Sequence, residues 1–232
     1  MPVLQAIVFD LDDTLYPERD FVFSGFRAVA GWAETHLDIP AHDGFAELRS
    51  LFEQGVRGDT FNHWLAAHRL ADDGLVTQLV QVYRGHTPQI KPFPEVLPLL
   101  QSLHRRYRLG LVSDGYLAVQ QRKLAALGLS SYLDAVVLSD EWGAEAWKPS
   151  PYPFQVVLER LGAEASRTVY VADNPTKDFL GARQAGLRTV WVRRPGGVYG
   201  HLNPPSPQHT PDVEIAALTE LESVLQKLEE LV

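Results

Sequence analysis

The sequence predicts an α/β protein whose parallel sheet is covered by helices on both faces and carries a separate helical insertion. Two observations predict this fold class. After about residue 89, short apolar runs alternate with amphipathic helical patterns, and parallel strands need such helical crossovers. Between Phe21 and Tyr83, by contrast, apolar residues recur at helical spacing, and no run there has the character of a strand.

The first element is a buried strand over Val3–Phe9, a run rich in branched residues. The insertion that follows is predicted to hold about four helices, in the stretches FVFSGFRAVAGWAETHL, FAELRSLFEQ, TFNHWLAAHRL and LVTQLVQVY. We therefore predict a core domain of residues 1–16 and 89–232, interrupted by a helical domain of residues 17–88.

The rest of the core alternates between helices and strands. Helices are predicted at 96–106, 117–128, 151–162, 176–186 and 218–232, and strands at 109–112, 135–138, 168–171, 187–194 and 212–215. Gly128 is the predicted C-cap of the second helix in this series. The stretch RPGGVYGHLNPPSPQHTP is rich in Pro and Gly and is predicted to be a surface loop.

Composition limits the class of protein. The chain has 232 residues, 45% of them hydrophobic, which is enough for a sizeable core. The net charge of −8 argues against a nucleic-acid partner, because phosphate backbones attract clustered Lys and Arg. There is no cysteine, no basic N-terminal segment typical of a signal peptide, and no apolar run near the roughly 18 residues that span a bilayer. We expect a cytoplasmic protein with no membrane partner.

Polar residues follow four of the predicted strands. Since ligands bind at the carboxyl ends of the strands in an open parallel sheet, these residues should share one edge. They are Asp10, Asp12, Asp13 and Thr14 after the first strand, Ser113, Asp114 and Gly115 after the second, Lys148 beyond the third, and Asp173, Asn174 and Asp178 after the fourth. Each one alone is more typical of a turn or a helix cap, but their order and spacing together favour a site.

These residue types suit phosphoryl transfer. A carboxylate such as Asp10 can attack phosphorus, and Asp12 can act as the general acid and then as the general base. Carboxylates at one edge repel each other unless a cation joins them, and oxygen ligands suit Mg²⁺. Lys148 and Ser113 can bind the phosphoryl oxygens.

The same residues resemble the haloacid dehalogenase (HAD) superfamily. IVFDLDDTL is similar to its first motif, LVSDG to the second, WKPSPYPF to the third, and VYVADNPTKDFLGARQAGLRTVWV to the fourth. The resemblance implies a Rossmann-like three-layer α/β/α core. It also implies that the helical insertion is a cap of the C1 type, placed after the first motif. The fourth motif departs from the usual Gly-Asp start, since Ala172 precedes Asp173.

The resemblance also implies a role for each residue. Asp10 would be the nucleophile and Asp12 the acid and base. Asp10, the main-chain carbonyl of Asp12, and Asp173 would bind Mg²⁺, while Ser113 and Lys148 hold the phosphoryl group. Supporting roles fall to Asp178, Asn174, Asp114 and Gly115.

The resulting prediction is a Mg²⁺-dependent phosphatase that acts on a small phosphorylated metabolite through an aspartyl-phosphate intermediate. A 2-haloacid dehalogenase is an alternative, but dehalogenases of this family lack the second aspartate, whereas Asp12 is present here. A phosphonate or sugar-phosphate enzyme, or a non-catalytic binding protein on the same scaffold, are further alternatives. Substrate-binding candidates are Tyr16 and Tyr116 beside the motifs, and Arg57 and Asn62 in the insertion.

Overall fold

The computed structural model describes residues 4–70 and 72–230. The chain divides into two compact units, one formed by the residues up to 17 and from 91 onward, the other by residues 18–90. Residues 17, 89 and 90 thus fall on the other side of the predicted boundaries. The reason is local, because the amide of Gln89 donates to Ser24 Oγ (2.9 Å) and so holds residue 89 to the helical unit. Among the described helices, none has the length and apolar character needed to cross a membrane.

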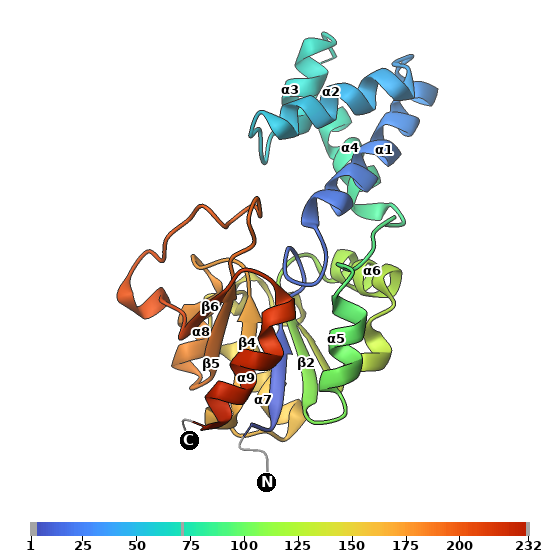
Figure 1. Ribbon diagram of the computed structural model, residues 1–232. Coiled ribbons are helices and arrows are strands. Elements are labelled where there is room, and N and C mark those ends of the chain that lie inside the picture. The colour runs from blue at the N-terminus through green and yellow to red at the C-terminus, as the bar shows by residue number, and fades with distance from the viewer. Residues whose placement is uncertain (1–3, 71, 231–232) are drawn as a thin grey trace. The chain divides into compact units, whose positions relative to one another are not determined.

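A parallel sheet forms the centre of the larger unit, in the order β3-β2-β1-β4-β5-β6 (Figure 1). Every pairing in it is parallel. The strands are β1 (Ala6–Phe9), β2 (Arg108–Ser113), β3 (Ala135–Leu138), β4 (Thr168–Ala172), β5 (Arg188–Val192) and β6 (Val213–Ile215). The predicted fold class is confirmed.

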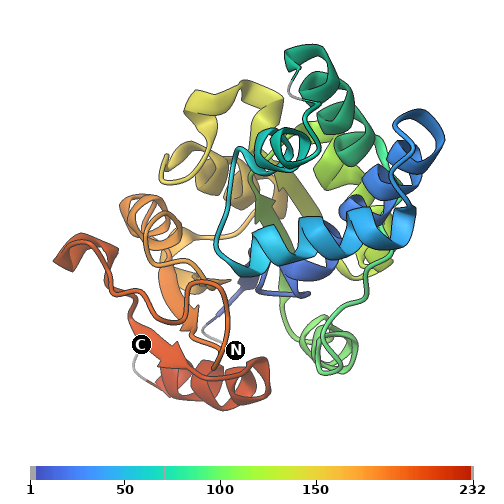
Figure 2. The same cartoon turned by 90° about the horizontal axis from the view of Figure 1, so that it is seen from above.

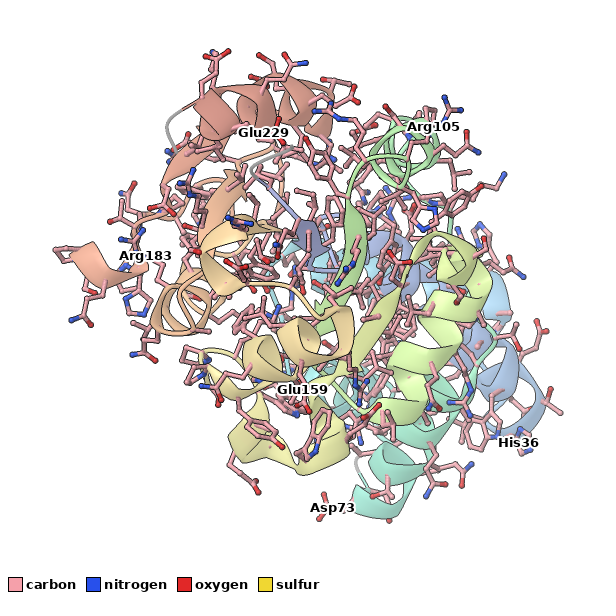
Figure 3. The ribbon with its side chains drawn as sticks, turned by 90° about the horizontal axis from the view of Figure 1, so that it is seen from below. His36, Asp73, Arg105, Glu159, Arg183 and Glu229 are labelled. Carbon is pink, nitrogen blue, oxygen red and sulfur yellow. The ribbon has the colours of Figure 1, made fainter. Side chains whose placement is uncertain are left out.

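Helices cover both faces of this sheet. Viewed from above, α5 and α9 lie on one side of it and α7 and α8 on the other (Figure 2). Seen from below, Arg105 lies in the turn that follows α5, and Glu229 lies in the last turn of α9 (Figure 3). The helices of this unit are α5 (Val96–Leu103), α6 (Leu117–Leu127), α7 (Tyr152–Leu161), α8 (Asp178–Gln184) and α9 (Leu221–Glu230).

The strand β1 lies at the middle of the sheet, between β2 and β4. Its four residues are fully buried and pair in register with both neighbours, so that Phe9 lies opposite Leu111 on one side and Val171 on the other. A strand buried on both faces needs apolar residues throughout, and the run Ala-Ile-Val-Phe meets that need. The residues that follow β1, β2 and β4 consequently emerge side by side.

The smaller unit is helical, as the apolar spacing predicts. Its described part contains α1 (Glu18–His36), α2 (Ala41–Glu53), α3 (Thr60–Ala67) and α4 (Asp73–Gly85). These helices share a core built largely of aromatic and branched side chains, with Phe26, Leu48 and Trp64 among its most buried members. The unit thus has a hydrophobic core of its own.

Several predicted boundaries move by a few residues. The helix α8 begins at Asp178, since residues 174–177 form a turn, and α9 begins at Leu221 after a short 3-10 helix. The predicted loop over residues 194–211 is irregular except for a 3-10 turn at Pro207–His209. Val3 and residues 231–232, which belong to predicted elements, lie outside the described residues.

Two glycines of α1 should respond in opposite directions to substitution by alanine. A Cβ at Gly25 would lie 2.4 Å from Cε2 of Tyr83 inside the helical core, so Gly25→Ala should lower the free energy of unfolding by about 1–3 kcal/mol. A Cβ at Gly31 would meet nothing within 4 Å, so Gly31→Ala should raise it by about 0.5–1 kcal/mol. Urea unfolding followed by circular dichroism checks both, and equal effects would contradict the packing described here.

Candidate active site

The carboxyl ends of the three central strands bring the first, second and fourth motifs together. Asp10 follows β1, Ser113 ends β2, and Asp173 follows β4. The amide of Asp10 donates to the carbonyl of Val171 (3.0 Å), so the strand pairing continues to the first residue of the site. All three side chains are buried.

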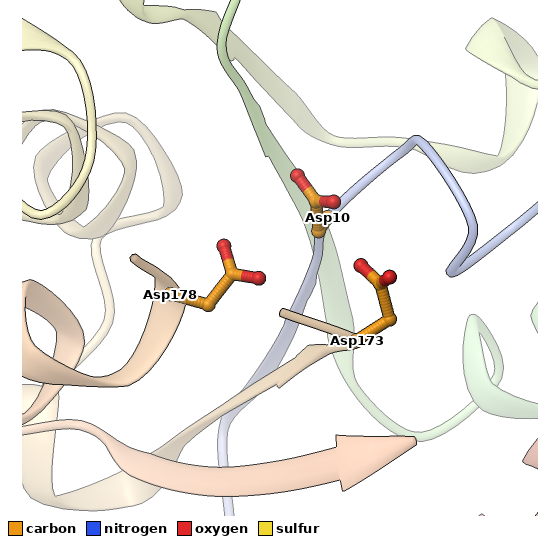
Figure 4. A group of neighbouring side chains, drawn as sticks. All are labelled: Asp10, Asp173 and Asp178. Carbon is orange, nitrogen blue, oxygen red and sulfur yellow. The ribbon is translucent and has the colours of Figure 1, made fainter. Parts of the chain in front are cut away.

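Three carboxylates converge at this edge of the sheet. Asp10, Asp173 and Asp178 each offer an oxygen atom, and these atoms lie within 4.8 Å of one another. Figure 4 shows the three groups pointing toward one another from the end of β1, the end of β4 and the start of α8. Such a set of oxygen donors suits a hard divalent cation.

Lys148 neutralises part of this charge. Its Nζ donates to Asp10 Oδ1 (2.5 Å), Asp178 Oδ1 (2.7 Å) and Tyr170 Oη (3.0 Å), which uses all three of its N–H groups. Burial lowers the pKa of Lys148, but the charges of Asp10 and Asp178 outweigh burial and hold that pKa well above its usual value. Lys148 is therefore a permanent cation beside Asp10.

Tyr170 is a member of the site that sequence reasoning missed. Its ring is fully buried in β4, and its hydroxyl donates to Asp178 Oδ1 (3.1 Å) while it accepts from Lys148. A tyrosine in the middle of a buried strand needs a partner for its hydroxyl, and that need is the sequence signal. The partners themselves, Lys148 and Asp178, could not be predicted from the sequence, because they lie in two other segments of the chain.

Asp173 has no comparable cation. Within the described residues it makes no ion pair, and its carboxylate accepts a long hydrogen bond from the hydroxyl of Thr14 (3.4 Å). Burial, together with the charges of Asp178, Asp10 and Asp13, raises the pKa of Asp173 well above its usual range. Burial also raises the pKa of Asp10 to about 6, although Lys148 opposes this. The carboxylates of Asp10 and Asp173 thus fit the binding of a divalent cation between them.

Asp12 lies in a different environment from Asp10. Its Oδ1 accepts from Lys123 Nζ (2.7 Å) and from the hydroxyl of Tyr16. Burial raises the pKa of Asp12, but the charge of Lys123 and these two hydrogen bonds leave it below its usual value. Two carboxylates two residues apart therefore have pKa values shifted in opposite directions, an arrangement typical of acid–base sites.

The helix α6 contributes two polar side chains to the site that the sequence alone did not single out. Gln120 Oε1 accepts from Ser113 Oγ (3.3 Å), and Lys123, one turn further along, reaches Asp12. Both lie on the buried face of α6 with Val119, Leu124 and Leu127. Polar residues at the apolar positions of an amphipathic helix need buried hydrogen-bond partners. This position in the helical pattern was the sequence signal that could have identified Gln120 and Lys123 as site residues.

The predicted supporting residues are found in the loops around the site. Asp114 accepts from Ser139 Oγ (2.7 Å) and from the amide of Lys148 (3.2 Å), so it joins the loops after β2 and β3. Gly115 has a φ of 118°, a conformation that favours glycine. Asn174 uses its side-chain oxygen in a turn with Thr176, while its amide donates to Asp178 Oδ2 (2.9 Å).

The four substrate-binding candidates divide between the two units, with Tyr16 and Tyr116 in the larger one and Arg57 and Asn62 in the helical one. Tyr16 is fully buried and bonded to Asp12, whereas the ring of Tyr116 is 51% exposed and lies edge-on to Trp147. Arg57 and Asn62 belong to the helical unit, where the Arg57 guanidinium donates to two main-chain carbonyls and lies over the Phe52 ring. Asn62 is exposed on α3.

Comparison with known families agrees with this geometry. The family described as haloacid dehalogenase-like hydrolase matches residues 7–192, which include all of the strand-end residues described above. The chain belongs to this family, and the resemblance seen in the four motifs is confirmed.

Among curated proteins, the chain is similar to glyceraldehyde 3-phosphate phosphatase of Methanopyrus kandleri. The two are 33% identical over 97% of this chain and 99% of that protein. Among solved structures, it resembles a HAD phosphatase from Thermococcus onnurineus (28% identity, 96% and 98% of the two chains, TM-score 0.62). It also resembles a 2-haloacid dehalogenase from Pseudomonas syringae (26% identity, 97% and 99%, TM-score 0.67).

Replacing Asp173 by asparagine should have two measurable effects, one on the stability of the metal-free protein and one on the response of that stability to Mg²⁺. Because the pKa of folded Asp173 is raised above 3.8, its ionised form destabilises the metal-free fold, and this cost fades as pH falls through the folded pKa. Asp173→Asn should therefore raise the melting temperature of the metal-free protein, by about 2–4 °C per kcal/mol of repulsion removed. The gain should be larger at about pH 8 than at about pH 5.

Added Mg²⁺ should raise the melting temperature of the wild type, because a ligand that binds only the folded state stabilises it. It should leave Asp173→Asn unchanged. Asp43→Asn, which alters an exposed carboxylate of α2, is the matched control and should respond to Mg²⁺ as the wild type does. An equal response of all three proteins would contradict a cation site at Asp173.

Proposed function

We propose that the protein is a Mg²⁺-dependent phosphatase that hydrolyses a small phosphomonoester through an aspartyl-phosphate on Asp10. The observation that carries this proposal is the pairing of Asp10 with Asp12. Asp10 is a buried carboxylate that accepts a hydrogen bond from Lys148. Asp12 is a carboxylate bonded to Lys123 and can carry the proton of the reaction. A curated relative that aligns with nearly the whole chain is itself named as a phosphatase.

In the first half of the proposed reaction, a carboxylate oxygen of Asp10 attacks phosphorus, and the bond from phosphorus to the leaving oxygen breaks. Asp12 in its protonated form donates that proton to the leaving alkoxide, so the alcohol departs neutral. Lys148 holds Asp10 in place during the attack. As the charge of Asp10 moves onto the phosphoryl group, an N–H of Lys148 becomes available to that group.

In the second half, water attacks phosphorus, the bond between phosphorus and the Asp10 oxygen breaks, and inorganic phosphate leaves with the Asp10 carboxylate restored. Asp12 accepts the proton of that water, which returns it to the form required for the next cycle. The lowered pKa of Asp12 means that the carboxylate, the form needed by a base, is the stable one beside Lys123. Ser113, whose hydroxyl now donates to Gln120, is placed to donate to a phosphoryl oxygen.

A Mg²⁺ ion bound by Asp10, Asp173 and the main-chain carbonyl of Asp12 would supply positive charge to the phosphoryl oxygens. Asp178 is less suited to be a ligand, because its oxygens already accept from Lys148, Tyr170 and the amide of Asn174. We assign to Asp178 the orientation of Lys148.

The dehalogenase alternative is disfavoured by Asp12. Displacement of a halide leaves an anion that needs no proton, so a second carboxylate with its own lysine has no task in that reaction. The similarity to a dehalogenase structure reflects a fold that serves both chemistries. Phosphonate hydrolysis, sugar-phosphate conversion and a non-catalytic binding role are the remaining alternatives.

The substrate is proposed to be a small phosphorylated metabolite, and a triose phosphate is the first to test because of the relative's name. The helical unit of residues 18–90 is proposed to be the cap that selects the substrate. A cytoplasmic location stays a prediction.

The test is phosphate release from a panel of phosphorylated metabolites and p-nitrophenyl phosphate, measured with Mg²⁺ and with EDTA. Activity should require Mg²⁺, and Asp10→Asn should reduce kcat by on the order of 10³-fold or more, because the nucleophile is lost. Asp43→Asn should keep full activity. Absence of release from every substrate by folded wild type would contradict the proposal, and 2-haloacids and phosphonates would then be assayed.

A further inference from the structure

Lys123 is a buried cation that the steps above do not use directly. Its side chain is 4% exposed, and its Nζ lies 2.7 Å from Asp12 Oδ1. Removing a lysine from water is costly, so a lysine at this depth needs a compensating contact. Asp12 supplies that contact, and the position of Lys123 is thereby tied to the proton-carrying carboxylate.

Both donors to Asp12 bind the same oxygen. Lys123 Nζ and the hydroxyl of Tyr16 each donate to Oδ1. Within the described residues, Oδ2 of Asp12 accepts no hydrogen bond. The two oxygen atoms of the Asp12 carboxylate thus have different surroundings, since Oδ1 accepts both hydrogen bonds.

The backbone explains how Tyr16 reaches Asp12. Asp13 adopts the left-handed conformation (φ 52°), and the amide of Leu15 donates to the carbonyl of Leu11 (2.9 Å), which folds the loop back on itself. A bridge then pairs residue 12 with residue 16. Aspartate tolerates this conformation better than most residues, which suits Asp13 to the turn.

We propose that Lys123 and Tyr16 are positioning residues that fix the rotation of the Asp12 carboxylate, so that Oδ2 is the oxygen that gives and takes the proton. A proton that binds Oδ1 would have to displace the hydrogen bonds from Lys123 and Tyr16. A proton that binds Oδ2 displaces no hydrogen bond among the described residues. Two bonds to one oxygen also prevent the carboxylate from turning about its Cβ–Cγ bond. This inference rests on the proposed phosphatase function and deepens it, because it assigns roles to residues that no motif includes.

A purely structural role for Lys123 leads to a different expectation. If Lys123 only balanced the charge of Asp12 and supported the fold, its loss would reduce the activity toward every phosphomonoester by a similar factor. If it positions Asp12, the loss depends on how much the leaving group needs a proton. An alkoxide needs one, whereas p-nitrophenolate leaves without one.

The experiment compares kcat/KM for an alkyl phosphate, glycerol 3-phosphate, with that for p-nitrophenyl phosphate. The ratio kcat/KM includes the steps up to departure of the leaving group, so the later attack of water does not enter it. The variants are Lys123→Met, Tyr16→Phe and Asp12→Asn. The control is Arg122→Met, at the neighbouring exposed position of α6. Circular dichroism and melting curves verify that each variant folds.

Lys123→Met should lose about 10- to 100-fold in kcat/KM with the alkyl phosphate and less than about threefold with p-nitrophenyl phosphate. Tyr16→Phe, which removes one oxygen atom and keeps the ring, should show the same selectivity with a smaller loss. Asp12→Asn should show it most strongly, and Arg122→Met not at all.

Equal losses on both substrates in folded Lys123→Met and Tyr16→Phe would overturn the inference in favour of a structural role. Full activity of both variants on both substrates would overturn it as well. These outcomes differ from a failure of the phosphatase proposal, in which the wild type hydrolyses neither substrate and the inference falls with it. If Lys123→Met does not fold, the selectivity of Tyr16→Phe decides.

Discussion

The burial of clustered carboxylates at the end of the central strand is the constraint on which the rest of this structure depends. Asp10, Asp173 and Asp178 are each buried beside the others, and an isolated charge in such surroundings is strongly unfavourable. Lys148 compensates two of them, through contacts in which the side chains of the lysine and of Asp178 are completely shielded from water. Breaking such a pair leaves an uncompensated charge, so neither partner is free to vary.

Packing around the site follows from this requirement. The helix α8 must bring Asp178 to Lys148, and it does so by approaching the loop after β3 very closely. A Cβ at Gly181 would lie 2.4 Å from the carbonyl oxygen of Pro149 and 2.6 Å from that of Ser150, so only glycine fits there. The fold thus places the first turn of a helix against the segment that carries the lysine, and the ion pair results from backbone contact.

The sequence was sufficient to predict the layers, the helical insertion and the strand ends, because these depend on local patterns. The run before Asp10 is apolar throughout, and the polar residues that follow this run and three others mark one edge of a parallel sheet. Lys123, Gln120 and Tyr170 were not predicted as site residues. Their partners lie between 7 and 111 residues away along the chain, and only the completed fold brings them together. Tyr16 was predicted as a substrate contact, but its hydroxyl donates a hydrogen bond to Asp12. This contact forms because the loop folds back and pairs residue 12 with residue 16, which residue types alone do not show.

The order of the strands also has a consequence for how the chain folds during its synthesis. The central strand β1 is made first, yet its neighbours β2 and β4 begin at Arg108 and Thr168. On the ribosome, β1 must therefore wait until most of the polypeptide has emerged before both of its edges can pair. The helices between residues 18 and 90 make their contacts within a short stretch and can associate much earlier. The insertion thus separates a nascent chain into a part that can fold early and a catalytic sheet that assembles late, and chaperones that bind exposed apolar segments would meet β1 in that interval.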